Sequence, residues 1–221
     1  MIFKFWGDPS NKSLVDDILV RSTGNFNWTF IFILAVVFYV YWSELHKKNY
    51  PAVFAGLALY GVHWLYEIMN AIIAKASGYP LWAVSNDSTT FILLIGVSWE
   101  LSMMFSLAGI ISFKMMPQDR TKRYFAKGKF KGISCKLMVA IEMALLFALF
   151  ESFLAGTTNG SFLWVYPWWG VVPVFFTTYI PFFLASNYIP DMKPKVRNIF
   201  LISIWGLVAL LLAILIPLGV I

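Results

Sequence analysis

Six stretches of apolar residues, separated by short polar loops, constrain this chain more than any other feature of its sequence. Each is close to the ~20 residues that a helix needs to cross ~30 Å of hydrocarbon. Charged residues make up only 13% of the chain, against roughly 25% in soluble domains. The sequence therefore predicts an all-α polytopic membrane protein, a six-transmembrane-helix bundle. The six predicted spans are Asn27 to Trp42, Ala52 to Ala74, Thr90 to Phe113, Ser134 to Leu154, Tyr166 to Tyr188 and Ile199 to Leu218.

The basic residues predict the orientation of these spans, because cytoplasmic loops carry an excess of lysine and arginine. The first, third and fifth loops hold 12 such residues, whereas the N-terminal tail and the remaining loops hold four. We therefore expect both termini to be extracytoplasmic. Residues 1–26 are predicted to form an extracytoplasmic tail that does not resemble a signal peptide, and residues 27–221 a single transmembrane domain. The membrane is expected to be the endoplasmic reticulum or a bacterial or archaeal plasma membrane.

Several classes of function are disfavoured. The net charge of +6 arises from loops that face an anionic membrane surface, so nucleic-acid binding is not expected. The chain has no Walker loop, no glycine-rich dinucleotide turn and no Glu-x-x-His pair, which disfavours nucleotide hydrolysis, hydride transfer and di-iron oxidation. The two histidines are poorly placed to bind a haem together, and the single cysteine, Cys135, cannot form an internal disulfide. We expect no cofactor and no metal.

Ionisable residues inside the spans are the candidates for chemistry, because a charge in hydrocarbon is costly and is usually retained for a function. His63, Glu67 and Asn70 are spaced by four and three residues, which places them on one face of the second helix. Glu100 is expected near the middle of the third helix. Two carboxyl groups beside a histidine are the ingredients of proton transfer. The alternative for His63 is an ordinary interhelical hydrogen bond.

The fourth span carries two further acids, Glu142 and Glu151. Nine residues at ~100° each place them on opposite faces of the helix, so they are not expected to share a site. Glu142 is expected to pair with Lys136, whose long stem can reach it. Glu151 lies toward the outer end, where a structural and a functional role are both open.

Aromatic residues are dense around these acids, including Trp64, Trp99 and Tyr179. Many would form an interfacial belt, yet aromatic faces also stabilise a cation in a dry site. Pro173 and Pro181 are expected to kink the fifth helix beside Thr178 and to free backbone carbonyls toward a cavity. We expect an apolar pocket bounded by the second, third and fifth helices and open toward lipid or the outer interface.

The order His63-x-x-x-Glu67 followed by Glu100 resembles the acid–base residues of the emopamil-binding (EXPERA-type) sterol isomerases. The pair Trp99-Glu100 is similar to the Trp-Glu pair of the small integral-membrane terpene cyclases. The resemblance covers the second, third and fifth spans. A sixth span departs from the five-helix isomerase plan, the cyclase glutamate belongs on the second helix, and only Asp191 is available as the cyclases' second acid. The resemblance implies protonation of an isoprenoid alkene, with aromatic residues around the carbocation.

We therefore expect a membrane-embedded acid–base enzyme, an isomerase or cyclase, that acts on a lipophilic isoprenoid or sterol-like molecule. The alternatives are a proton-coupled transporter or channel that uses the same carboxylates, and a non-catalytic membrane subunit. The expected partners are the lipophilic substrate and the lipid bilayer, and the oligomeric state is left open. The expected catalytic residues are Glu100, Glu67 and His63, and the expected substrate-binding residues are Asn70, Trp64, Trp99, Tyr179, Thr178 and Glu151.

Overall fold

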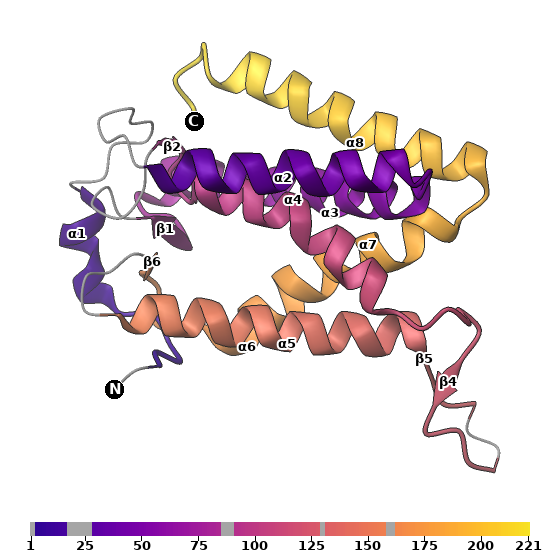
Figure 1. Cartoon of the computed structure of the whole chain (residues 1–221). Helices are drawn as coiled ribbons and strands as arrows, with labels where there is room; N and C mark the ends of the chain where they lie inside the picture. Colours follow the sequence, from indigo (N-terminus) through magenta and orange to yellow (C-terminus); the bar gives the residue numbers. More distant parts are fainter. Residues whose placement is uncertain (1–2, 17–27, 85–90, 129–130, 158–161) are drawn as a thin grey trace.

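The computed structural model of the protein is predominantly helical and describes residues 3–16, 28–84, 91–128, 131–157 and 162–221 (Figure 1). The predicted first residues of two spans, Asn27 and Thr90, lie outside the described residues. Five segments in the described part are long and apolar enough to cross a membrane. They are α2 (Trp28–His46), α3 (Tyr50–Ser77), α5 (Cys135–Gly156), α8 (Pro194–Leu215) and the broken helix Val171–Asp191.

The third predicted span differs from the expectation. Its helix, α4, runs only from Trp99 to Met115, and the apolar residues before it form a short hairpin of β2 (Ile92–Leu94) and β3 (Val97–Ser98). Ser98 caps the helix, because its side chain accepts a hydrogen bond from the backbone N–H of Leu101. A short apolar run does not by itself distinguish a strand from a helix. Glu100 consequently lies in the first turn of α4, and its predicted position at mid-helix was wrong.

The helix Val171–Asp191 is interrupted, as its prolines predict. It consists of α6 (Val171–Pro173), the π-helical segment η3 (Val174–Tyr179), α7 (Ile180–Tyr188) and the 3₁₀ turn η4 (Ile189–Asp191). Pro181 has no N–H to give to the carbonyl of Thr177, four residues earlier. The hydroxyl of Tyr66 donates to that carbonyl instead, at 2.7 Å.

Helix α3 lies at the centre of the bundle and packs against α4, α7 and α8, while α5 packs against α7. The contact of α3 with α4 is close because small residues face each other. A Cβ on Gly109 would lie 2.5 Å from the carbonyl oxygen of Ala55. Helices α2 and α8 are largely exposed at the outside of the bundle, as expected of helices that face lipid.

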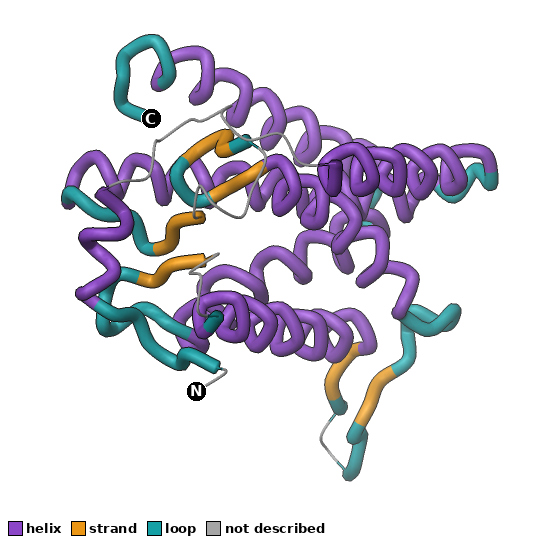
Figure 2. Tube along the Cα trace, turned by 60° about the vertical axis from the view of Figure 1, so that its left-hand side comes forward, coloured by secondary structure: helices purple, strands orange, loops and turns teal. Residues whose placement is uncertain are grey.

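One end of the bundle is closed by short strands and by the N-terminal segment (Figures 1 and 2). Strand β1 (Trp82–Val84) pairs antiparallel with β6 (Phe162–Trp164). The N-terminal segment, with the turn η1 (Pro9–Asn11) and the helix α1 (Lys12–Asp16), packs beside β6. Both chain termini lie at this end. At the opposite end, β4 (Arg123–Tyr124) and β5 (Ile133–Ser134) form a second hairpin. The bundle is therefore helical with three small two-stranded sheets among the described residues, rather than strictly all-α.

The N-terminal segment is held by backbone hydrogen bonds to residues far along the chain. The N–H of Gly7 donates to the carbonyl of Trp169 at 2.7 Å, and the N–H of Asp8 donates to the carbonyl of Trp164 at 3.0 Å. Gly170 allows this approach, because a Cβ there would lie 2.2 Å from the carbonyl oxygen of Phe5. We call residues 3–11 the N-terminal strap.

The expected pairing of Lys136 with Glu142 was wrong. The ammonium of Lys136 lies 2.5 Å from a carboxylate oxygen of Asp191, while Glu142 is exposed on α5. Asp191 is brought near because η4 ends beside the start of α5. This pair lies at the end of the bundle opposite the strap, which leaves Asp191 unsuited to be the second acid of a cyclase.

Candidate functional site

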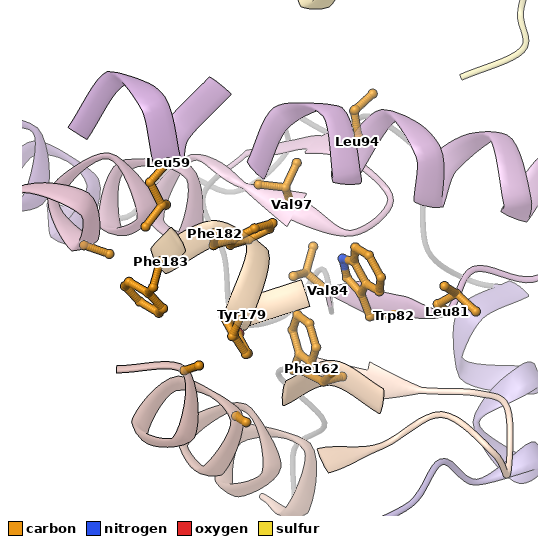
Figure 3. Packing of buried hydrophobic residues seen from close by; sticks show 14 of the residues in the cluster. Leu59, Leu81, Trp82, Val84, Leu94, Val97, Phe162, Tyr179, Phe182 and Phe183 are labelled. Atoms are coloured by element: carbon orange, nitrogen blue, oxygen red, sulfur yellow. The ribbon is translucent and has the colours of Figure 1, made fainter. Parts of the chain in front are cut away.

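A small cavity lies inside the bundle, between α3, α4, α5 and the broken helix, and beneath β1 and β6. Its volume is about 40 Å³, enough for roughly three or four water-sized groups, since one water needs ~10–15 Å³ by this measure. Apolar and aromatic side chains form most of its walls. Figure 3 shows Tyr179, Phe182, Phe162 and Trp82 among the buried residues between the layers. The polar side chains that line the cavity are His63, Glu67, Trp82, Glu151, Trp169, Thr178 and Tyr179.

The cavity reaches the surface of the bundle between α4 and α5. Among its described lining residues, those on α3, the strands and the broken helix are buried. The partly exposed ones all belong to α4 and α5, and Phe150 is the most exposed of them, at 44%. Because these two helices contact each other only weakly, the opening faces sideways, toward the space that lipid would occupy.

Among the described residues, Glu67 is one of two carboxyl groups that line the cavity. It is 4% exposed, and the indole Nε1 of Trp82 lies 3.2 Å from each of its oxygens and donates to them. His63, one turn earlier on α3, places Nε2 3.4 Å from Glu67 Oε1, although the two groups are not aligned for a hydrogen bond. Gly96 packs against Glu67 and Trp82, because a Cβ there would lie 2.5 Å from Glu67 Oε2 and from Trp82 Nε1. The i, i+4 spacing of His63 and Glu67 therefore brings both groups to the cavity, as the sequence predicts.

Asn70 holds the partner of Glu67 in place. Its side chain donates to the carbonyl of Trp82 at 2.8 Å and accepts from the N–H of Leu81 at 2.8 Å. Asn70 is fully buried but does not line the cavity. It lies on the same helical face as Glu67, as predicted, yet its visible role is to position the Trp82 backbone and not to contact a ligand.

Glu151 is the second carboxyl group and comes from the opposite wall. It is 7% exposed and accepts two hydrogen bonds, from the Tyr179 hydroxyl at 2.5 Å and from Trp164 Nε1 at 2.7 Å. The sequence places Glu151 toward the outer end of its helix but does not reveal these partners. The cavity thus collects acids from α3 and α5, together with a phenol and an imidazole.

The ring of His63 is enclosed by aromatic groups. It stacks on Phe105 of α4 with ring centroids 4.1 Å apart and an interplanar angle of 24°, and Phe182 meets it edge-on. Trp82 stacks on Trp169 at 5.6 Å. Phe105, Trp82 and Trp164 were not predicted from the sequence. The only available signal was an indole in each of the loops that follow α3 and α5.

Four of the predicted site residues do not line the cavity, and Asn70, described above, is one of them. Trp99 is 36% exposed and packs edge-on against Phe30, and Trp64 is partly exposed beside Tyr60. Glu100, in the first turn of α4, does not line the cavity either. The predicted group therefore divides. Five of its members line the cavity: Glu67, His63, Glu151, Thr178 and Tyr179. The other four do not: Asn70, Glu100, Trp99 and Trp64.

Residues 10–217 match the profile of a family described as "Uncharacterized membrane protein family". The chain belongs to this family. It is also 36% identical over 177 residues to a protein of Archaeoglobus fulgidus described as "Uncharacterized protein", which covers 79% of this chain and 80% of that relative. No solved structure matches the chain. The family match and the apolar helices establish an integral membrane protein.

The matched residues include every polar group of the cavity and most of the transmembrane bundle. Chemically, the cavity combines two carboxyl groups with a phenol and an imidazole behind aromatic walls. Carboxyl, phenol and imidazole groups are side chains that act as general acids and bases in proteins. Within the described residues, no three His, Cys, Asp or Glu side chains lie together as a metal-binding group.

Proposed function

We propose that this protein is a membrane-embedded acid–base enzyme that isomerises or cyclises a lipophilic isoprenoid or sterol-like substrate. The observation that carries the proposal is that Glu67 and Glu151, from opposite walls, line one aromatic cavity that opens sideways between α4 and α5. A lateral opening gives access to a molecule dissolved in the bilayer. Because the cavity holds only about 40 Å³, the reacting end of the substrate would enter it, while the rest would stay between α4 and α5 or in lipid.

In the proposed reaction, Glu67 donates a proton to one carbon of an alkene, and the π electron pair forms the new C–H bond. The resulting carbocation is stabilised by the faces of Phe105, Tyr179 and Phe182, since aromatic quadrupoles attract cations in a dry site. Glu151 then removes a proton from a neighbouring carbon, and that C–H electron pair becomes the new double bond. Glu151 then releases the proton it has gained to water, and Glu67 takes up a proton from water through His63, so that both acids end in their starting protonation states. Glu100 has no role in this scheme, because it does not line the cavity.

We also propose six membrane crossings with both termini outside the cytoplasm. Helix α4 runs through the bundle between the same two ends as its neighbours in Figure 1, although it has only 17 residues. The basic hairpin of β4 and β5 lies at the end opposite both termini, which fits the charge rule. The archaeal relative favours an archaeal plasma membrane over the endoplasmic reticulum.

The orientation is tested with single cysteines in a Cys135→Ala background. An impermeant thiol reagent applied to intact cells should label Lys12→Cys and should label Ala126→Cys only after permeabilisation. Labelling of Ala126→Cys alone in intact cells would invert the topology.

The reaction is tested by hydrogen exchange. The protein in lipid nanodiscs is incubated in D₂O with the lipid extracted from its own preparation, and deuterium in that lipid is measured by mass spectrometry. Glu67→Gln and Glu151→Gln should each lower deuterium incorporation by about 10²-fold or more, the usual contribution of a general acid or base. Glu100→Gln and Glu142→Gln, which change acids outside the cavity, should stay within about twofold of the unmodified protein. Undiminished incorporation in a Glu67→Gln/Glu151→Gln double variant would refute the proposal.

A proton-coupled transporter is the second candidate, and one observation favours it. The π-helical segment Val174–Tyr179 interrupts a spanning helix beside the carboxyl groups, and discontinuous helices form the ion and substrate sites of many transporters. Transport predicts proton movement into proteoliposomes that depends on Glu67 and on a solute gradient. The enzyme predicts deuterium incorporation without any gradient.

A further inference from the structure

Three buried polar side chains of the cavity lack hydrogen-bond partners within the described part of the chain. They are His63, at both ring nitrogens, Trp169, at Nε1, and Thr178, at Oγ1. All three are more than nine-tenths buried, with exposures of 1%, 6% and 7%. All three line the same cavity. Buried polar groups are nearly always paired, because an unpaired one forfeits its hydration without compensation.

The backbone around Trp169 and Thr178 fixes where these two donors lie. The indole of Trp169 stacks on Trp82, and its backbone is held from both sides, by its N–H to the carbonyl of Tyr166 at 2.9 Å and by the N–H of Gly7 to its own carbonyl. The neighbouring Thr177 satisfies its hydroxyl in the usual way, by donating to the carbonyl of Pro173 at 2.7 Å. Thr178 lies in the same π-helical segment but makes no such bond and faces the cavity.

The types of these groups define what they can bind. An indole N–H can only donate a hydrogen bond, and a threonine hydroxyl can donate or accept one. A neutral imidazole donates at one ring nitrogen and accepts at the other. The cavity is small, so an atom inside it is close to several lining groups at once. An uncharged oxygen that accepts from Trp169 and Thr178 fits this set, whereas a pure hydrocarbon would leave these donors buried and unpaired.

We infer that the cavity binds a hydroxyl or carbonyl oxygen of its ligand through Trp169 Nε1 and Thr178 Oγ1, so the substrate is an oxygen-bearing lipid rather than a plain hydrocarbon. This inference rests on the proposed function only in taking the cavity as the substrate site. The oxygen fixes the orientation of the ligand, and its alkene then lies toward Glu67 and Glu151. His63 adds a third polar contact on the wall formed by α3.

The test measures binding and requires no turnover. Three radiolabelled probes with one C15 isoprenoid skeleton are compared: the alcohol, the aldehyde and the hydrocarbon. Saturable retention by the protein in nanodiscs is corrected with empty nanodiscs for partition into lipid. We expect the better of the two oxygenated probes to bind at least about tenfold more tightly than the hydrocarbon, because sites built to hydrogen-bond an oxygen reject analogues that lack it. Tighter binding of the alcohol would indicate that the site takes a hydroxyl oxygen, and tighter binding of the aldehyde that it takes a carbonyl oxygen.

The variants remove the donors, because Thr178→Val keeps the shape of the side chain without its hydroxyl and Trp169→Phe keeps an aromatic ring without the N–H. Trp169→Phe with Thr178→Val should reduce the preference for the oxygenated probe to less than about threefold, and Thr178→Ser, which keeps the hydroxyl, should retain it. Trp168→Phe and Thr177→Val are the matched controls, because Trp168 and Thr177 are exposed and should leave the preference unchanged. If the double variant does not fold, Thr178→Val alone should still lower the preference at least twofold.

Equal binding of all three probes, no saturable binding of any, or an undiminished preference in the variants would overturn the inference. Failure of the proposed function has a different signature. A preference for oxygenated probes without deuterium exchange would refute the proposed enzyme activity and leave the oxygen-binding site standing. Deuterium exchange without such a preference would refute the oxygen-binding site and leave the enzyme activity standing.

Discussion

The hydroxyl of Tyr179 donates to a carboxylate oxygen of Glu151 at 2.5 Å, across a helix interface in the interior of the bundle. Trp164 donates to the other oxygen, so both acceptor atoms of this buried acid are engaged. This arrangement joins α5, the π-helical segment and β6 at one point. The stability of the bundle and the position of one proposed catalytic acid therefore depend on the same contacts.

Removing the phenol tests the structural part of this coupling. Tyr179→Phe should lower the free energy of unfolding by about 1–3 kcal/mol, because it leaves a buried carboxyl oxygen short of a donor. Tyr39→Phe is the matched control, since Tyr39 is 73% exposed and should change stability by less than about 0.5 kcal/mol. Denaturation in mild detergent, followed by tryptophan fluorescence, measures both. Equal stability of the two variants would show that the Tyr179 bond contributes nothing measurable.

Gly170 should be required for attachment of the N-terminal strap. In Gly170→Ala, the new Cβ would lie 2.2 Å from the carbonyl oxygen of Phe5, which is backbone and has no rotamer to relieve the clash. We expect the strap to detach and its peptide bonds to be cut by protease at least about tenfold faster. Gly206→Ala is the control, because a Cβ there meets nothing within 4 Å. A strap that stays protected in Gly170→Ala would contradict the packing described above.

The strap should also loosen in acid. Hydrogen bonds from the side chain and the backbone N–H of Ser10, followed by the contact with Lys4, lower the pKa of Asp8 from 3.8 to about 2. A lowered pKa means that the carboxylate stabilises the folded strap above pH ~4, and that this contribution is lost as the pH falls from ~4 to ~2. Amide hydrogen exchange of Ser10 and Asn11 should therefore accelerate, relative to the intrinsic rate, over this interval. In Asp8→Asn the relative rate should already be high at pH 7 and should change little.

The ion pair of Lys136 and Asp191 should stabilise the end of the bundle opposite the strap. The two side chains are 17% and 29% exposed, so we expect Asp191→Asn to cost about 1–2 kcal/mol, between the values for exposed and for buried pairs. Glu142→Gln should cost less than about 0.5 kcal/mol, because the exposed carboxyl of Glu142 is not the partner of Lys136. The free energy of unfolding of the two variants, measured under the same conditions, shows whether Lys136 pairs with Asp191 or with Glu142. A larger loss for Glu142→Gln would restore the pairing that the sequence alone suggests.

Local spacing allowed part of the site to be predicted from the sequence. His63 and Glu67 meet because four residues make about one helical turn, and this relation does not depend on the rest of the fold. Pro173 and Pro181 similarly predict the break in their helix, because a proline inside a helix removes a backbone hydrogen bond. The positions of most spanning segments follow from hydropathy, since each needs ~20 apolar residues.

Only the tertiary structure decided how these elements combine. The position of Glu100 in its helix was predicted wrongly, because an apolar run has the same hydropathy whether it forms the β2–β3 hairpin or a helix. Glu151 meets Tyr179 and Trp164 across 28 and 13 residues, and such contacts depend on how each helix is rotated about its axis. The sequence by itself determined that the chain is an apolar helical bundle that carries acidic residues, because the hydropathy that places a segment in lipid belongs to each segment alone. Which acids share a cavity, and which donors remain unpaired within it, depends on packing between segments, and no single segment encodes that.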